Sequence, residues 1–188
     1  MKKSLFYGSI IFLSVILISC GGSSSLSSTD EGDIPDWYLN TPKDDNILYA
    51  SSSATSKDMQ LAINKAATDA RAEIARNIEL RVKGLSKKFD EEVGQGEKAE
   101  LLQQFTQVSK VVVSTSLSGS EIAKKEIFKS GGNWRAYVLA KYPIGEANRT
   151  LQQQIRNNKN LYTRFRETQA MKQLDDEVEK FEEWKKSQ

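Results

Sequence analysis

Histidine is absent from this chain of 188 residues, and cysteine occurs only once. Without histidine the chain cannot carry Ser-His-Asp or Cys-His catalysis, an imidazole general base or a histidine metal site. A single cysteine excludes an internal disulfide and the cysteine clusters that hold zinc. Any catalysis would therefore depend on carboxylate pairs, lysine, serine or tyrosine. We predict no catalytic, cofactor-binding or metal-ligating residue.

The one cysteine, Cys20, lies at the end of a targeting segment. Lys2 and Lys3 precede a mostly apolar stretch from Leu5 to Ile18, and Gly-Gly-Ser-Ser-Ser follows the cysteine. A basic start, a short apolar core and a small residue before the cut site define a secretory signal, and cysteine at that site indicates a lipoprotein. We predict a signal peptide over residues 1–19 and lipidation of Cys20.

Two other interpretations of this segment are weaker. A transmembrane helix needs roughly 20 apolar residues, whereas this stretch has about 14. An ordinary signal peptide with a chance cysteine would not need the aliphatic and small residues that precede Cys20 here.

Lipidation predicts where the mature protein resides. Two or more acyl chains, such as palmitate, hold a protein stably on a membrane, whereas a single chain binds reversibly. Gly21 follows Cys20 at the position where aspartate retains lipoproteins at the inner membrane. We therefore expect an outer-membrane anchor and a domain that faces the periplasm.

The charge balance gives no evidence for a nucleic-acid partner. The chain has 27 Lys and Arg residues and 25 Asp and Glu residues. Loss of Lys2 and Lys3 with the signal makes the two numbers equal. A formally neutral mature chain lacks the basic surface that binds phosphate backbones.

A linker is predicted before the folded domain. Residues 20–33 are rich in Gly and Ser, which is typical of a flexible tether. The domain is then expected over residues 34–143. Pro35 and Pro42 argue against helix over residues 34–46, so we expect an extended segment there.

The first half of the domain predicts a strand followed by helices. Residues 47–54 read as a strand, and Thr55 to Asp58 have the spacing of a capping box that begins a helix. Small apolar residues then recur every four positions, which predicts a helix packed closely on a sheet. That stripe comprises Ala62, Ala66, Ala70, Ile74, Ile78 and Val82. A second helix should run from Lys98 to about Val108, and residues 110–115 could be helix or strand.

The second half of the domain predicts a hairpin. Residues 120–129 and 133–142 alternate in polarity on either side of Gly131 and Gly132. In the first of these strands, one face is expected to carry Ile122, Lys124, Glu126 and Phe128. Together these elements predict an α+β fold: a small antiparallel sheet of about three strands packed against helices, with a long C-terminal helix.

The C-terminal helix is expected over residues 144–188. Its apolar stripe comprises Leu151, Ile155, Tyr162, Phe165, Leu174, Val178 and Phe181, with a break in period near Thr168. At about 1.5 Å per residue it exceeds the face of a small domain, so its second half, residues 173–188, is expected to project. We predict a partner-binding surface there, formed by Leu174, Val178, Phe181 and Trp184.

Charge is segmented along this expected helix. Residues 149–172 are mostly basic, and residues 173–188 are mostly acidic. The basic half could bind anionic lipid or an acidic partner. We favour the interpretation that the two halves complement a neighbour or another copy, so self-association stays open.

Two pairs of adjacent acids are the candidates for a carboxylate-based hydrolase. They are Asp44 with Asp45, and Glu91 with Glu92. Because adjacent residues point to different sides of a strand or helix, neither pair has convincing acid/base geometry.

Three aromatic residues are the candidates for a small-ligand or peptidoglycan site: Trp37, Trp134 and Tyr137. Aromatic side chains at strand positions are more often part of the core. A solvent-facing aromatic cluster beside the hairpin would favour the ligand hypothesis.

Several weak motifs occur in an order typical of one family. A lipobox is followed by Pro35-Asp36-Trp37, and then by Tyr49-Ala50 and a serine-rich turn. Next comes a helix that ends Ala70-Arg71-Ala72-Glu73-Ile74-Ala75. The last motif is a Gly-Gly hairpin with Trp134 and Tyr137-Val138-Leu139-Ala140. Over about residues 35–143 this resembles the Lpp-twenty family of small bacterial outer-membrane lipoproteins. That domain is similar to the N-terminal domain of the flagellar assembly protein FlgT.

The resemblance implies an α+β domain, an envelope location and an accessory or interaction role, with no catalytic residue to carry over. We therefore expect a non-catalytic, membrane-anchored lipoprotein that binds a protein partner in the bacterial envelope. A small-ligand or peptidoglycan-binding module is the alternative, and a hydrolase is less favoured than either.

Overall fold

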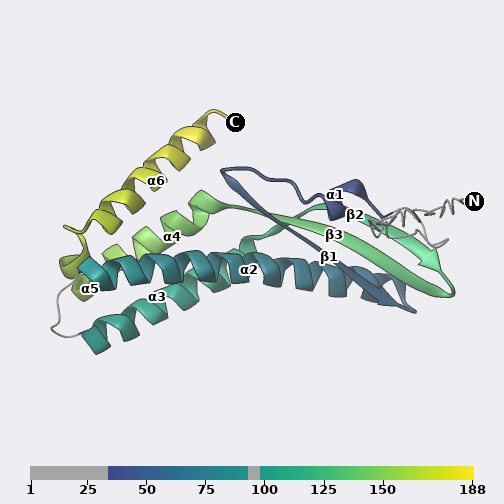
Figure 1. Cartoon of the computed structure of the whole chain (residues 1–188), viewed down its shortest axis with the longest axis horizontal. Helices are drawn as coiled ribbons and strands as arrows, with labels where there is room; N and C mark the ends of the chain where they lie inside the picture. The colour runs from purple at the N-terminus through teal and green to yellow at the C-terminus, as the bar shows by residue number, and fades with distance from the viewer. Residues whose placement is uncertain (1–33, 93–97) are drawn as a thin grey trace, which may run out of the picture.

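The computed structural model describes residues 34–92 and 98–188 of the chain. Three strands form one antiparallel sheet in the order β1-β3-β2: β1 (Ile47–Ser56), β2 (Glu121–Ser130) and β3 (Asn133–Pro143). The helix α2 (Met59–Glu92) runs along one face of this sheet, over β1 and β3, and continues past its end (Figure 1). The expected α+β fold is confirmed.

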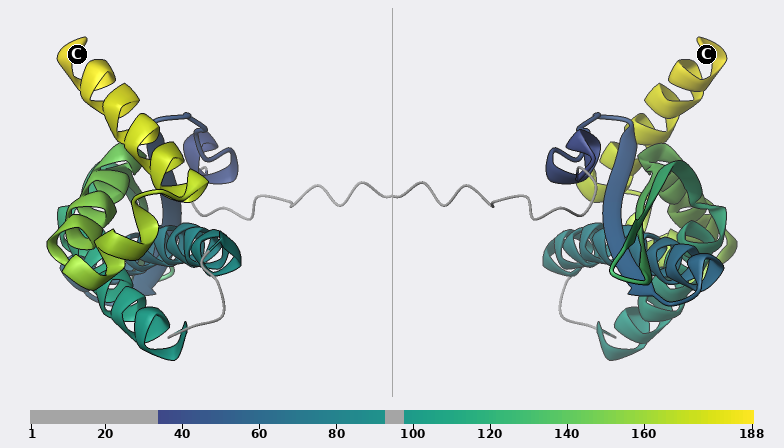
Figure 2. Two further views of the ribbon diagram at one scale, coloured as in Figure 1. Left: turned by 90° about the vertical axis from the view of Figure 1, so that its left-hand side faces the viewer. Right: turned by 90° about the vertical axis from the view of Figure 1, so that its right-hand side faces the viewer.

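The other long helices gather around the part of α2 that extends beyond the sheet (Figure 1), and the left view of Figure 2 shows them from that end. Helix α3 (Lys98–Gly119) packs on α2, and α4 (Ile144–Asn157) packs on α3; α5 (Lys159–Phe165) and α6 (Gln169–Lys186) follow. Phe89 of α2 stacks on Phe165 of α5, with ring centroids 4.3 Å apart. A single hydrophobic core thus continues from the sheet into the helices.

Helix α2 begins at an aspartate cap. The Oδ1 atom of Asp58 accepts a hydrogen bond from the backbone N–H of Leu61 at 2.7 Å. The start expected at Thr55 is wrong, because β1 continues to Ser56 in register with β3. The predicted stripe of small residues is buried, and Ala66 and Ala70 are 0% exposed, so the helix lies close to the sheet.

The predicted hairpin of β2 and β3 is confirmed, with one change of face. Gly131 and Gly132 have φ angles of 53° and 85°, which the two-residue turn requires. A bulge between Ile122 and Lys124 adds a residue to β2. Ile122 therefore shares the α2 face with Ile127 and packs partly on the core, not the face of Lys124 as simple alternation predicts.

The ambiguous segment 110–115 is helical and belongs to α3. Val108, Val112 and Ser116 recur every four residues and are buried in the helix layer that α3 forms with α2 and α4. The hydroxyl of Ser116 donates to the carbonyl of Val113 at 2.8 Å, so its burial leaves no polar group unsatisfied. Packing against neighbouring helices, not intrinsic propensity, selects helix for this β-branched segment.

The segment expected to be extended, residues 34–46, contains one helical turn, α1 (Asp36–Leu39). Pro35 does not prevent this turn, because a proline ahead of the first turn removes no hydrogen bond that the helix needs. The turn lies on the face of the sheet opposite α2. There the ring of Tyr38 contacts that of Tyr137 with centroids 4.8 Å apart, and its hydroxyl is 3.2 Å from that of Ser53.

The C-terminal segment is helical as expected, but α4, α5 and α6 replace one continuous helix. The side chain of Asn158 accepts hydrogen bonds from the backbone N–H groups of Asn160 and Leu161, which ends α4 and begins α5. Thr168, where the apolar period breaks, caps α6 through the N–H of Met171 at 3.1 Å. These two polar caps let the chain reverse direction, so that α6 folds back on α4.

Candidate functional site

Helices α4 and α6 form an antiparallel pair that contains the predicted partner-binding residues. Leu174, Val178 and Phe181 are 2%, 8% and 4% exposed. Trp184 is half-buried, and its ring stacks on that of Phe181 with centroids 5.7 Å apart. The apolar stripe of α6 is therefore covered by the chain's own domain.

Polar contacts run along the same helix pair. Lys185 of α6 lies 3.0 Å from Glu146 of α4, and Arg149 of α4 lies 3.6 Å from Glu182 of α6. At the other end Asp175 of α6 lies 3.0 Å from Arg156 of α4. Arg149 and Arg156 of the basic half thus face acids of the acidic half within one chain. Exposed ion pairs of this kind add little stability individually.

The expected projection of residues 173–188 is wrong. The turn at Thr168 sends α6 back across α4, so the helix does not leave the domain as a straight extension would. A partner could reach Leu174, Val178 and Phe181 only if α6 detached. Partner binding through these residues and Trp184 stays a prediction, and Trp184 is the member of the set with the most accessible side chain.

The start of α6 is held by a residue from a distant helix. The two carboxylate oxygens of Glu92, at the end of α2, accept hydrogen bonds from the backbone N–H groups of Gln169 and Ala170, at 2.6 and 3.0 Å. An anion at a helix N-terminus also interacts favourably with the helix dipole. This carboxylate, a candidate acid in the sequence, is thus a tertiary helix cap.

The other candidate acids also have structural surroundings. The Oδ1 atom of Asp44 accepts hydrogen bonds from the N–H groups of Asn46 and Ile47, at 2.7 and 3.1 Å, which shapes the turn before β1. Glu91 lies 3.9 Å from Lys87 on the surface of α2, and Asp45 lines a surface hollow next to Lys180. Among the described residues, no group of three or more His, Cys, Asp or Glu is placed to hold a metal ion.

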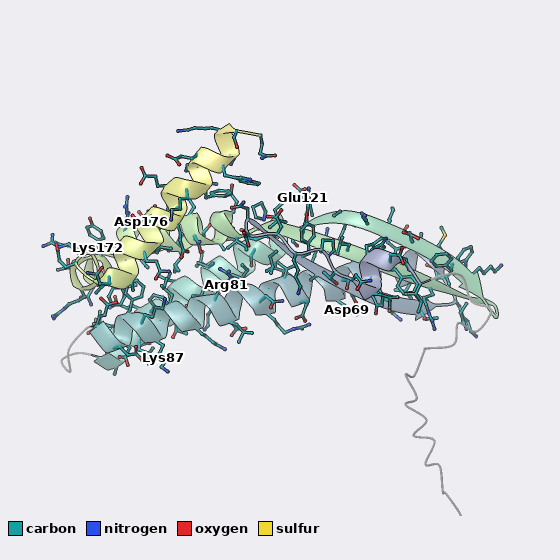
Figure 3. All side chains as sticks on the ribbon, turned by 45° about the horizontal axis from the view of Figure 1, so that its top comes forward. Asp69, Arg81, Lys87, Glu121, Lys172 and Asp176 are labelled. Carbon is teal, nitrogen blue, oxygen red and sulfur yellow. The ribbon has the colours of Figure 1, made fainter. Side chains whose placement is uncertain are left out.

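A groove lies between α2, α4 and α6. Its two adjoining parts have volumes of about 270 and 250 Å³ and share Arg81, Asn148 and Glu177. Glu177 accepts hydrogen bonds from Asn148 at 2.9 Å and from Gln173 at 3.0 Å. Arg81 projects from α2 and is exposed (Figure 3). The sequence does not reveal this groove, because its walls meet only when α6 folds back.

The three candidate ligand-binding aromatics do not meet. Tyr137 lies on the outer face of the sheet and is buried beneath Tyr38 and Phe128. Trp134 is on the opposite face, packed partly on the core with Lys129 over its ring. Trp37 donates from its indole nitrogen to Glu126 at 2.7 Å. Alternation along β3 places Trp134 apart from the other two, whereas Trp37 lies on the same face as Tyr137 and contacts it through Tyr38, with Trp37 and Tyr38 centroids 6.5 Å apart.

The lipidation site predicted at Cys20 lies outside the described residues, as does the signal peptide. Of the helices that the structure describes, none has the length and apolar character needed to cross a bilayer.

The described residues form a small α+β domain of three strands and surrounding helices. The family model for LPP20 lipoprotein matches residues 35–142, and the chain belongs to this family. It is therefore a lipoprotein of the cell envelope, associated with a membrane through lipid. No curated protein and no solved structure matches the chain.

Proposed function

We propose that this chain is a non-catalytic lipoprotein that binds another envelope protein as an accessory or assembly factor. Lipid on Cys20 anchors it in the outer membrane, and the domain faces the periplasm. Residues 1–19 are the signal peptide, and residues 20–33 are the lipidated cysteine and its linker. Residues 34–143 form the α+β domain, and residues 144–188 add the C-terminal helices.

The observation that carries the proposal is the role of the candidate acids. Glu92 and Asp44 accept backbone N–H groups and are thereby committed to local structure. A general acid or base must instead reach a substrate proton. The LPP20 lipoproteins are also not a known enzyme family. Together these points support binding, not turnover, as the activity of the domain.

Photo-crosslinking in the native envelope tests this proposal. A photoreactive amino acid at position 184 borders the outer surface of α6, and one at Asp69 on α2 is an exposed control (Figure 3). We expect a covalent adduct of one defined mass from position 184 and none of that mass from position 69. Identical adduct patterns from both positions would contradict a specific partner at α6. A reproducible hydrolase turnover, abolished by one Asp or Glu substitution, would contradict the non-catalytic part.

A small ligand in the groove under α6 is the second candidate function. Its volume of about 270 Å³ lies just below the range of about 300–1,000 Å³ for small-ligand sites, and Arg81 and Lys88 line it. Soluble peptidoglycan fragments should then raise the melting temperature of the full chain. The rise should disappear in Arg81→Ala and persist in Arg76→Ala, an exposed arginine of the same helix. No shift with any fragment would remove this candidate.

A further inference from the structure

The outer edge of β2 is open in the part of the chain that the structure describes. Strand β2 pairs with β3 on one side only, because the sheet order is β1-β3-β2. After the bulge, its register with β3 is regular from Lys124, opposite Leu139, to Ser130, opposite Asn133. An edge strand of this kind presents unpaired backbone N–H and C=O groups to another chain.

An apolar groove lies beside this edge, between α2 and β2. Its volume is about 340 Å³, and it is lined by Ile63, Ala67, Ile122, Ala123, Val138, Lys124 and Lys125. The groove exists because α2 lies over β1 and β3, which leaves the β2 part of that face thinly covered. The bulge contributes as well, because it turns Ile122 toward the groove.

The charged side chains at this edge leave an excess of positive charge. Glu121 forms an ion pair with Lys141 at 3.4 Å, and Glu126 accepts a hydrogen bond from the indole N–H of Trp37. Within residues 34–92 and 98–188, the side chains of Lys124 and Lys125 have no hydrogen bond or ion pair, and both are exposed. Lysines on an edge strand discourage pairing with neutral or basic strands, and a second copy of β2 would bring more lysines to the same edge. An acidic strand is the partner that these charges favour.

We propose that the β2 edge binds an extended acidic segment of another envelope protein, which adds to the sheet as a further strand. Backbone hydrogen bonds to β2 give affinity, and alternate side chains give specificity. The apolar side chains of that segment occupy the groove beside Ile63 and Ile122, and its carboxylates, on the opposite face of the sheet, pair with Lys124. The inference rests on the proposed function and names the partner class.

A peptide of alternating Glu and Val, seven residues long, is the probe. The full chain in detergent is titrated with the labelled peptide, and binding is followed by fluorescence anisotropy and by hydrogen exchange of residues 121–130. We expect binding with slower exchange along β2. A peptide with Lys in place of Glu should not bind, and neither should one with a central Pro, which cannot complete the ladder.

Charge reversal tests the two lysines directly. Lys124→Glu with Lys125→Glu should weaken peptide binding by about tenfold or more, through loss of the Lys124 contact and new repulsion from both positions. The matched control reverses Lys87 and Lys172, two exposed lysines away from β2 (Figure 3), and should bind like the wild type. Equal binding of the Glu and Lys peptides, unchanged exchange at β2, or dimer formation through β2 would each overturn the inference. If the peptide does not bind, but the charge-reversal variant still forms the envelope adduct from position 184, only this inference is overturned. The proposed function then stands.

Discussion

The ring of Phe181 rests on the backbone of Gly145, so closely that a side chain at position 145 has no room. A Cβ built on Gly145 would lie 2.5 Å from the Cβ of Phe181 and closer still to its ring. Gly145 is in the first turn of α4, and Phe181 is near the end of α6. This contact fixes where the two antiparallel helices cross and accounts for the burial of the α6 stripe.

Gly145→Ala should therefore destabilise the protein, by about 1–3 kcal/mol, because the methyl group overlaps the Phe181 ring. Urea denaturation of the full chain measures the change. Gly84→Ala is the control, since nothing lies within 4 Å of a Cβ there and alanine favours a helix interior. If Gly145→Ala is as stable as the Gly84 variant, α6 does not pack on α4 in solution.

Leu174→Ala should destabilise the protein by about 2–5 kcal/mol, as expected for a fully buried leucine. A projecting α6 would instead tolerate this change with almost no loss. The measurement is the free energy of unfolding in urea, and Leu80→Ala, at an exposed position of α2, is the control. Deletion of residues 173–188 should likewise lower the melting temperature. An unchanged melting temperature in both variants would restore the projecting arrangement.

Glu92→Ala should cost about 1 kcal/mol, because the first N–H groups of α6 lose their carboxylate cap. Glu92→Gln keeps an acceptor but removes the charge, so its effect should be smaller. Glu91→Ala removes only a long surface ion pair and should change stability little. Thermal unfolding at low salt compares the three variants. Equal effects of Glu91→Ala and Glu92→Ala would argue against the cap.

Tyr142 should make the protein sensitive to alkaline pH. Burial raises the pKa of its phenol above 10.0, and Glu146 raises it further, while Arg149 opposes the shift. A raised folded-state pKa means that the folded state holds the proton more tightly than the unfolded state. The stabilisation is complete below pH 10 and is lost as pH rises toward the folded-state pKa. Tyr142→Phe should flatten this loss, whereas Tyr162→Phe, at an exposed tyrosine, should leave it intact. Identical alkaline unfolding profiles would contradict the prediction.

Cys20→Ala should remove the site of lipid attachment and leave an uncleaved precursor or a soluble species. Membrane fractionation and intact mass measure the outcome, and Ser19→Ala, which keeps a small residue before the cut site, should still be processed. A Cys20→Ala protein that fractionates with membranes at the mature mass would rule out lipidation at this residue.

Local signals in the sequence determine a large part of the fold. The stripe from Ala62 to Val82 and the turn at Gly131 and Gly132 were both predicted, because four-residue spacing and glycine φ angles depend only on near neighbours in the chain. The order of weak motifs along residues 35–143 was likewise enough to indicate the family that the match over residues 35–142 shows.

Tertiary contacts decide the rest. Residues 110–115 are helical because Val108 and Val112 pack between helices, and Ile122 changes face because of a bulge that alternation does not reveal. The start of α6 is capped by Glu92, which lies 77 residues before the N–H of Gln169 that it binds. Such contacts form only when distant segments are brought together. The sequence shows the basic and acidic halves of the C-terminal segment, and only the folded chain shows that they bind each other.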